Sequence, residues 1–312
     1  MSSRVVVLTG ASSGIGRAAA VAFAARGDRL VLAARAKDDL DETAAACGND
    51  PLVVPTDITR REDLDRLVAQ AVAAYGRVDV WVDSAAVMAY GKFEDLPPEV
   101  FDRMIGTDLL GSANVARTAL RQFRAQGHGT LIGVSSLLAH VTVPYISAYV
   151  TAKWGQRGLF RTLQHETRDA PDIHVCTVAP GSVDTPIYTS AANYAGFVGR
   201  PPPPVDSAER IAARVVRLAD KPRPSASVGA TNRLIELGFT LFPPVYDALV
   251  TPLMRRGGLS RQEIAGTDGN VFGARPRTEG GPGRWGRLPV GLAVAAVALA
   301  AGASVKRLLP HK

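Results

Sequence analysis

Cysteine and aromatic residues are both scarce in this chain. The two cysteines, Cys47 and Cys176, lie far apart and lack the spacing of a metal site or a disulfide framework. This usage fits a reduced compartment, so a cytoplasmic location is expected. Aromatic residues make up 6% of the sequence, and no basic patch is interleaved with them. The formal net charge of +7 therefore does not indicate a nucleic-acid partner.

A targeting signal is also lacking at the N-terminus. The first ten residues, MSSRVVVLTG, enter an apolar strand directly, without an apolar h-region or a cleavage site. We therefore expect no signal peptide. The length of 312 residues and the hydrophobic content of 46% allow one large domain of about 200 to 250 residues with a tail, or two smaller domains.

Short apolar runs alternate with longer amphipathic segments along the chain. Each run is rich in Val, Leu or Ile and lacks alternating polar residues, which is typical of strands covered on both faces. Strict alternation of strands and helices predicts an α/β fold with a doubly wound, Rossmann-like parallel sheet. The expected strands are RVVVLTG, RLVLAAR, PLVVPTD, VDVWVDSAA, GTLIGVSS and IHVCTVAP, and the expected helices include residues 17–26, 61–75, 99–124 and 149–167.

A glycine-rich turn joins the first expected strand to the first expected helix. It reads TGASSGIG and contains Gly10, Gly14 and Gly16. Such a turn lets backbone N–H groups approach a pyrophosphate, and the helix N-terminus adds a favourable field. The junction therefore predicts a dinucleotide phosphate site, whereas three glycines without this context would indicate an ordinary loop.

Tyr149 and Lys153 follow much later, four residues apart, where a helix brings side chains onto one face. Together with the glycine-rich turn, this Tyr-x-x-x-Lys spacing resembles the short-chain dehydrogenase/reductase family, from about residue 5 to residue 229. Ser136 precedes Tyr149 by thirteen residues, which resembles the family's spacing for its catalytic serine. The AANYAG stretch also resembles a subgroup of bacterial members with long C-terminal tails.

Further segments carry the same resemblance and imply where the cofactor binds. PGSVDTP, residues 180–186, resembles the segment that closes over the nicotinamide, and Asp57 resembles the adenine-side aspartate. Homo-oligomers are implied by analogy alone. No metal site is expected. The implied cofactor-binding residues are Gly10, Ser12, Ser13, Gly14, Ile15, Gly16, Arg35, Asp57, Ile58, Ser84, Ala85, Tyr149, Lys153, Pro180, Gly181, Val183 and Thr185.

The chemistry of Tyr149 depends on its neighbours. A free phenol has a pKa of about 10, and a cationic Lys153 with the positive nicotinamide would favour the phenolate. The resemblance implies that Ser136 hydrogen-bonds the substrate oxygen, Tyr149 exchanges its proton, and Lys153 also holds the nicotinamide ribose. Without the family context, Tyr149 and Lys153 would indicate a packed ring beside a solvated charge, and Ser136 a loop serine capping its own backbone.

The end of the second expected strand, RLVLAARAKDD, bears on the choice of cofactor. An acidic residue there would accept a hydrogen bond from the ribose 2′-OH, but Ala34 occupies the position and Arg35 follows. NADP is therefore favoured over NAD. Two observations weaken this preference: Arg35 could be a solvated charge at a helix start, and Ser13 replaces the basic residue that many NADP-using members carry.

Two positions depart from the family pattern. Asp83 begins the sequence Asp-Ser-Ala-Ala where the family usually has Asn-Asn-Ala-Gly, and Asp108 stands where it usually has a catalytic Asn. A carboxylate accepts hydrogen bonds but does not donate them, so Asp108 would alter a water-mediated proton relay. Asp83 could instead accept from backbone amides in a purely structural role. The alternative to an enzyme is thus an NADP-binding sensor or scaffold with weak or no turnover.

The substrate is indicated by the segment between Pro186 and Pro204, which we expect to form a lid. Its apolar and aromatic residues, Ile187, Tyr188, Tyr194 and Phe197, favour a lipophilic ketone, aldehyde or secondary alcohol. These side chains could instead only pack the lid against the domain. The most favoured function is an NADP-dependent oxidoreductase acting on such a compound.

The tail differs in composition from the rest of the chain. We assign residues 1–253 to the dinucleotide-binding domain and residues 254–287, rich in Gly and Arg, to a linker. Residues 288–305 are uncharged and, as a helix, would extend roughly 27 Å, close to a hydrocarbon core of about 30 Å. They predict a membrane-associated or membrane-spanning helix that anchors a cytoplasmic domain, or a helix packed on protein.

Overall fold

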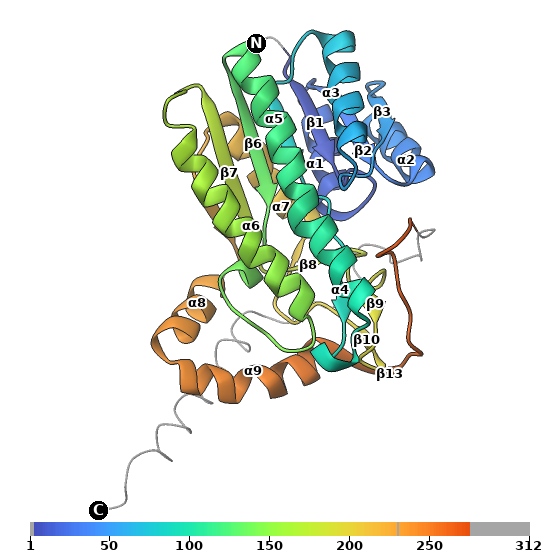
Figure 1. Ribbon diagram of the computed structural model, residues 1–312, viewed down its shortest axis with the longest axis vertical. Coiled ribbons are helices and arrows are strands. Elements are labelled where there is room, and N and C mark those ends of the chain that lie inside the picture. The colour runs from blue at the N-terminus through green and yellow to red at the C-terminus, as the bar shows by residue number, and fades with distance from the viewer. Residues whose placement is uncertain (1–2, 230, 275–312) are drawn as a thin grey trace, which may run out of the picture.

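The computed structural model describes residues 3–229 and 231–274, and a seven-stranded sheet forms its centre. The strand order is β12-β7-β6-β4-β1-β2-β3, and every neighbouring pair is parallel. This confirms the predicted α/β fold with a doubly wound sheet. Figure 1 labels β1, β2, β3, β6 and β7 of this sheet. The strands are β1 (Val5–Thr9), β2 (Arg29–Ala34), β3 (Leu52–Pro55), β4 (Val80–Asp83), β6 (Gly129–Val134), β7 (Ile173–Pro180) and β12 (Ser225–Val228).

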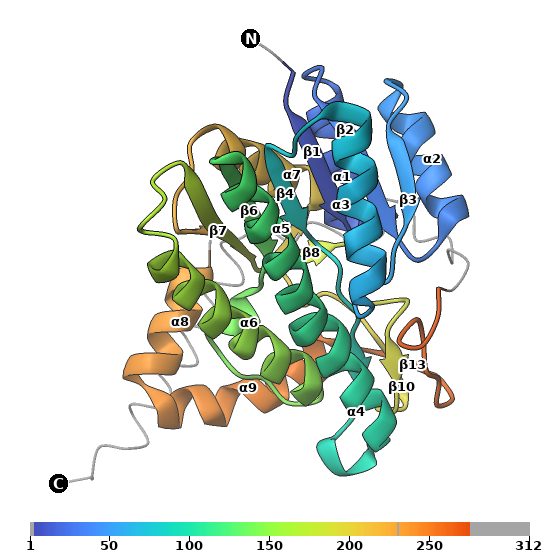
Figure 2. The ribbon, with the colours of Figure 1, turned by 45° about the horizontal axis from the view of Figure 1, so that its top comes forward.

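Helices cover both faces of the sheet. One face packs against α1 (Gly14–Ala24), α2 (Lys37–Cys47) and α7 (Ala208–Asp220). The other packs against α3 (Arg61–Tyr75), α5 (Ser112–Gln126) and α6 (Ser147–Glu166), which run side by side in Figure 2. This arrangement explains why the strands are apolar at consecutive positions.

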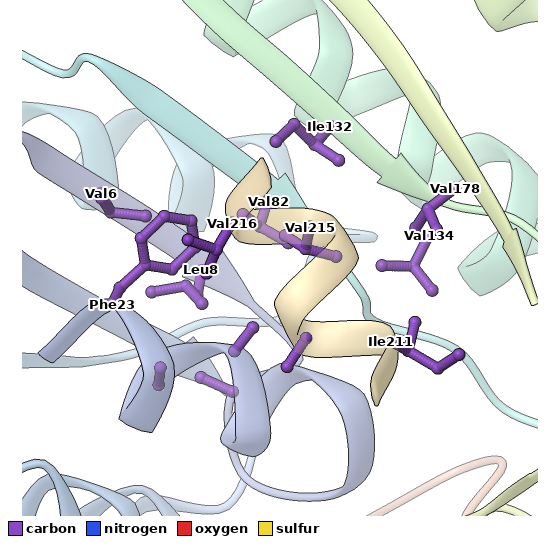
Figure 3. Packing of buried hydrophobic residues seen from close by; sticks show 14 of the residues in the cluster. Val6, Leu8, Phe23, Val82, Ile132, Val134, Val178, Ile211, Val215 and Val216 are labelled. Carbon is purple, nitrogen blue, oxygen red and sulfur yellow. The ribbon is translucent and has the colours of Figure 1, made fainter. Parts of the chain in front are cut away.

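Strand β1 contributes side chains to the hydrophobic cores on both faces of the sheet. Successive side chains of a strand point to opposite faces. Val6 and Leu8 therefore join Phe23 of α1 and Val215 of α7 (Figure 3), whereas Val7 joins the core on the other face. All five residues of β1 are buried.

Smaller elements lie beyond the carboxyl ends of the strands. Three short pairs are β5 (Ala89–Tyr90) with β9 (Ala192–Asn193), β8 (Ser182–Asp184) with β11 (Val205–Ser207), and β10 (Phe197–Gly199) with β13 (Leu259–Glu263). The helices there are α4 (Pro98–Ile105), α8 (Asn232–Leu241) and α9 (Pro243–Gly257), the last two forming an angle at the lower end of Figure 1.

The helix expected over residues 99–124 is interrupted. α4 and α5 are separated by a π-helical turn, Gly106–Gly111, which contains Asp108. Such turns recur at functional sites because the extra residue displaces one side chain from the regular helical register. Periodicity alone does not reveal it, since the helical pattern continues on both sides.

Part of the predicted linker is structured. Residues 254–274 include the end of α9, strand β13 and a buried Val271 that packs beside Met254 and Leu259. Few apolar residues suffice here because the segment packs onto the existing domain. Residues 275–287 of the predicted linker and the predicted hydrophobic helix, residues 288–305, lie outside the described residues. Among the helices that are described, none is long and apolar enough to cross a membrane.

Candidate active site

One cavity of about 1450 Å³ lies at the carboxyl ends of the strands. The strand order reverses between β1 and β4, which is where doubly wound sheets bind their ligands. Every residue predicted to bind the cofactor lines this cavity, and so does Ser136. The structure thus brings together segments that lie up to 175 residues apart in the sequence, from Gly10 to Thr185.

The glycine-rich turn has the backbone that the sequence predicts. Gly10 and Gly14 have φ values of +76° and +51°, which favour glycine. A Cβ at Gly16 would lie 2.1 Å from the carbonyl oxygen of Gly10, so this position admits no side chain. The turn therefore exposes backbone at the N-terminus of α1, where N–H groups can bind a phosphate. The residues present fit a dinucleotide.

Ser136, Tyr149 and Lys153 lie together in the cavity wall. Ser136 follows β6, and its Oγ accepts a hydrogen bond from the backbone N–H of Leu138 at 3.1 Å. Tyr149 and Lys153 lie one turn apart on α6, with the Lys153 Nζ 5.4 Å from the centre of the Tyr149 ring. The ammonium group also donates to the carbonyl of Val134 at 3.2 Å. A hydroxyl, a phenol and a cation therefore lie close together in the cavity wall.

Burial is the main cause of the pKa shifts of Tyr149 and Lys153. It raises the pKa of Tyr149 above its ordinary value of 10, and the nearby Asp108 raises it further, whereas a hydrogen bond with Ser136 lowers it. The sequence led us to expect a pKa lowered by Lys153. Burial also lowers the pKa of Lys153, against the opposing influence of Asp108 and Asp83. Tyr149 is therefore a neutral phenol at neutral pH, and this form can donate a proton.

Asp108 does not line the cavity but lies directly behind it. Its Oδ1 accepts a hydrogen bond from the backbone N–H of Val87 at 2.9 Å, and Val87 does line the cavity. Its Oδ2 is buried and has no hydrogen-bond partner among the described residues. Burial raises the pKa of Asp108 to about 7. Below that pH the carboxyl group carries a proton and regains the donor that a charged carboxylate lacks.

Asp83 belongs to a buried hydrogen-bond network. Its Oδ1 accepts from Thr9 Oγ1 at 2.9 Å and its Oδ2 from Ser112 Oγ at 2.6 Å. Gln156 donates to the same Ser112 Oγ at 2.9 Å and accepts from Lys153 Nζ at 3.5 Å. The backbone N–H of Ala85 also hydrogen-bonds Asp83, as the structural alternative expected. Burial raises the pKa of Asp83, and the hydroxyls of Ser112 and Thr9 lower it more than this amide does. The network connects the carboxylate with Lys153 through two neutral groups.

Arg35 and Asp57 line the cavity beyond the ends of β2 and β3, at the edge of the sheet away from β6 and Ser136. The two oxygens of Asp57 are engaged: Oδ1 accepts from the N–H and hydroxyl of Thr59, and Oδ2 accepts from Arg103 at 2.9 Å. The Arg35 guanidinium donates to two backbone carbonyls near the end of the described residues. Burial lowers the pKa of Arg35 from 12.5. The guanidinium N–H groups that the bonds to these two carbonyls do not use can bind an anionic ligand.

Comparison with known proteins identifies the family of this chain. A family model described as short chain dehydrogenase matches residues 4–194. The chain belongs to the short-chain dehydrogenase family. A Bacillus subtilis relative, described as an uncharacterized oxidoreductase, is 30% identical over 81% of this chain and 73% of its own. A Staphylococcus haemolyticus relative with the same description is 34% identical over 63% of this chain and 84% of its own. The chain is therefore an oxidoreductase.

Solved structures of the family share the fold. The alcohol dehydrogenase of the archaeon Thermococcus sibiricus, complexed with 5-hydroxy-NADP, is 30% identical with a TM-score of 0.62, over 73% of this chain and 95% of that one. A short-chain dehydrogenase from Streptomyces avermitilis is 27% identical with a TM-score of 0.66, over 79% of this chain and 99% of that one. Membership in the short-chain dehydrogenase family implies a nicotinamide cofactor.

About half of the remaining cavity wall lies outside residues 4–194, the segment that matches the short-chain dehydrogenase family model. The predicted lid contributes Ile187 and Tyr188, whereas Tyr194 hydrogen-bonds Asp268 and Phe197 is exposed, so neither of these two lines the cavity. Sequence reasoning missed the wall formed by α8 and α9. The sequence signal that could have revealed this wall is the helical spacing of its apolar residues. Those that line the cavity include Leu234, Ile235, Leu237, Leu241, Phe242, Val245, Leu249, Val250, Leu253 and Met254.

Proposed function

We propose that this short-chain dehydrogenase is an NADPH-dependent reductase of lipophilic ketones or aldehydes. The observation that carries the proposal is the convergence of Ser136, Tyr149 and Lys153 in the cavity that the predicted cofactor residues also line. The nicotinamide supplies the hydride when it is bound. Ser136 holds the substrate oxygen, and Tyr149 donates its phenolic proton to that oxygen as negative charge develops there.

The proton balance favours reduction in this proposal. Tyr149 is a neutral phenol because burial and Asp108 raise its pKa, so it holds the proton that the nascent alkoxide needs. After donation, the phenolate lies near the ammonium group of Lys153, which stabilises the negative charge. Asp108, with a pKa of about 7, exchanges protons behind the site. Secondary-alcohol oxidation is the same reaction in reverse.

NADPH is proposed over NADH because of the residues at the adenosine end. Ala34 provides no carboxylate for a ribose 2′-OH, and Arg35 provides a cation for a 2′-phosphate. Charge-assisted hydrogen bonds to a phosphate are worth about 1.5 to 3 kcal/mol. We therefore expect NADPH to bind more tightly than NADH.

A lipophilic substrate is proposed because of the wall formed by α8 and α9. Leu234, Leu237 and Leu241 recur on one face of α8, and each side chain is about half exposed, at 45%, 53% and 61%. All three line the cavity, so an alkyl or isoprenoid group of the substrate would remove them from water. A polar substrate would leave these leucines exposed to water, so their burial would contribute no binding free energy.

The alternative function is an NADP-binding sensor or scaffold with little turnover. The carboxylates of Asp83 and Asp108 favour it, since both occupy positions where the family usually has amides. The test is NADPH oxidation with straight-chain ketones and aldehydes of increasing length. We expect KM to fall about fourfold for each methylene that reaches the α8–α9 wall, at about 0.8 kcal/mol per methylene. NADPH binding without turnover of any substrate in the series would favour the sensor.

A further inference from the structure

A short segment near the end of the described residues contacts the adenosine end of the cavity. We call this segment, Thr267–Val271, the strap. The Arg35 guanidinium donates from Nη2 to the carbonyl of Asn270 at 2.8 Å and from Nη1 to the carbonyl of Val271 at 3.3 Å. Asn270 itself lines the cavity. The strap thus holds the cation that faces the cofactor site, although it lies about 235 residues away in sequence.

The strap is docked firmly onto the lid. Asn193 and Thr267 exchange both backbone hydrogen bonds, at 2.7 and 3.0 Å, and Asn270 donates its N–H to the carbonyl of Ser190 at 2.9 Å. Val271 is fully buried. Gly269 has a φ of +53°, and a Cβ there would lie 2.3 to 2.4 Å from the backbone of Ser190, Ala191 and Ala192. The close approach depends on glycine at this position.

The geometry leaves Arg35 able to bind a phosphate. A guanidinium has five N–H donors, and the strap carbonyls take two of them, so three remain. Fixing a flexible arginine before the ligand arrives reduces the entropy lost on binding. Asn270 Oδ1 is buried without a partner among the described residues, which is expected where a ligand supplies the donor.

We propose that the strap is a specificity element of the cofactor site: its carbonyls orient Arg35 toward the 2′-phosphate and so favour NADPH over NADH. The proposal rests on the proposed function, because it assumes that a 2′-phosphate binds at Arg35. It assigns the strap a positioning role, exerted through Arg35. By linkage, a 2′-phosphate that fixes Arg35 also stabilises the docked strap by the same factor.

The direct test compares two glycine substitutions by the dissociation constants of NADPH and NADH. Gly269→Ala forces the strap away from the lid, whereas Gly273→Ala is a matched control, since a Cβ there meets nothing within 4 Å. We expect Gly269→Ala to lower the preference for NADPH about fivefold, the order of magnitude for one immobilised side chain. Gly273→Ala should leave the preference unchanged.

A double-mutant cycle separates positioning from a general loss of structure. In an Arg35→Ala background, Gly269→Ala should have no further effect on the ratio of the two dissociation constants. An equal effect in both backgrounds would overturn the role through Arg35. A wild-type protein that prefers NADPH, with a Gly269→Ala variant that keeps the full preference, would overturn the strap proposal alone. A wild type without any preference would overturn the NADPH part of the proposed function as well.

Hydrogen exchange in the wild type provides a test if Gly269→Ala fails to fold. The amides of Thr267 and Asn270, which hydrogen-bond the lid, should exchange about fivefold more slowly with saturating NADPH than with saturating NADH. Equal protection by the two nucleotides would contradict the proposed coupling.

Discussion

Tyr149, Lys153 and Asp108 form a set of buried ionisable groups whose charges depend on one another. Burial raises the pKa of Tyr149 and of Asp108 and lowers that of Lys153, so each charged form is disfavoured. Asp108 opposes the shift of Lys153 and adds to that of Tyr149. A change at Asp108 therefore alters the proton affinity of both neighbours without touching the substrate.

Asp108→Asn should change the pH dependence of carbonyl reduction. The pKa of Asp108 is raised to about 7, so the group is protonated below that pH and charged above it. When Asp108 loses its proton, it can no longer donate a hydrogen bond, and its negative charge raises the pKa of Tyr149. The wild-type kcat should therefore fall as the pH rises through about 7. The Asn side chain keeps its N–H donor at every pH. The kcat of the Asp108→Asn variant should therefore equal that of the wild type near pH 6 and exceed it about tenfold near pH 9. Identical pH profiles would contradict this role.

Ser112→Ala should destabilise the fold by about 1 to 3 kcal/mol, because it leaves Asp83 Oδ2 and Gln156 Nε2 without their partner in a buried site. Urea denaturation measures the change. Ser225→Ala, at an exposed position on β12, is the control and should alter the free energy of unfolding by less than about 0.5 kcal/mol. An equal effect of the two substitutions would mean that the network adds no stability.

At the scale of elements, the central sheet and the glycine-rich turn were predictable because their signals are local. The six expected strands all form, and the helix expected over residues 61–75 has those bounds in the structure. The π-helical turn around Asp108 and the strap were not predictable, since each depends on contacts with distant residues. The short β12 was missed because Ser225–Val228 alternates polar and apolar residues, unlike the other strands.

The first βα turn gives a prediction at this scale. Gly16→Ala would place a Cβ 2.1 Å from the carbonyl oxygen of Gly10 and 2.5 Å from Ser84 Oγ. The turn must shift, so NADPH affinity should fall at least tenfold, as measured by calorimetry. Gly158→Ala on α6 is the matched control, because a Cβ there meets nothing within 4 Å. It should leave affinity unchanged and stabilise the helix by about 0.5 to 1 kcal/mol.

At the scale of the whole molecule, residues 3–229 and 231–274 contain the sheet, both helical layers and all the cavity-lining residues that the proposed function uses. A chain that ends at Ala274 should therefore fold and bind NADPH within about twofold of the full chain's affinity. Circular dichroism and calorimetry measure the two properties. Loss of folding or of binding would mean that residues 275–312 belong to the catalytic domain.

The most direct test of the proposed reductase compares two tyrosine variants on the same helix-and-loop segment. Tyr149→Phe removes the phenolic proton, and Tyr145→Phe removes a hydroxyl from a residue that does not line the cavity. We expect Tyr149→Phe to lower the rate of NADPH oxidation with a medium-chain ketone at least 10²-fold while the NADPH dissociation constant stays within about twofold. Tyr145→Phe should retain wild-type turnover. Undiminished turnover in Tyr149→Phe would contradict the proposal that Tyr149 is the proton donor.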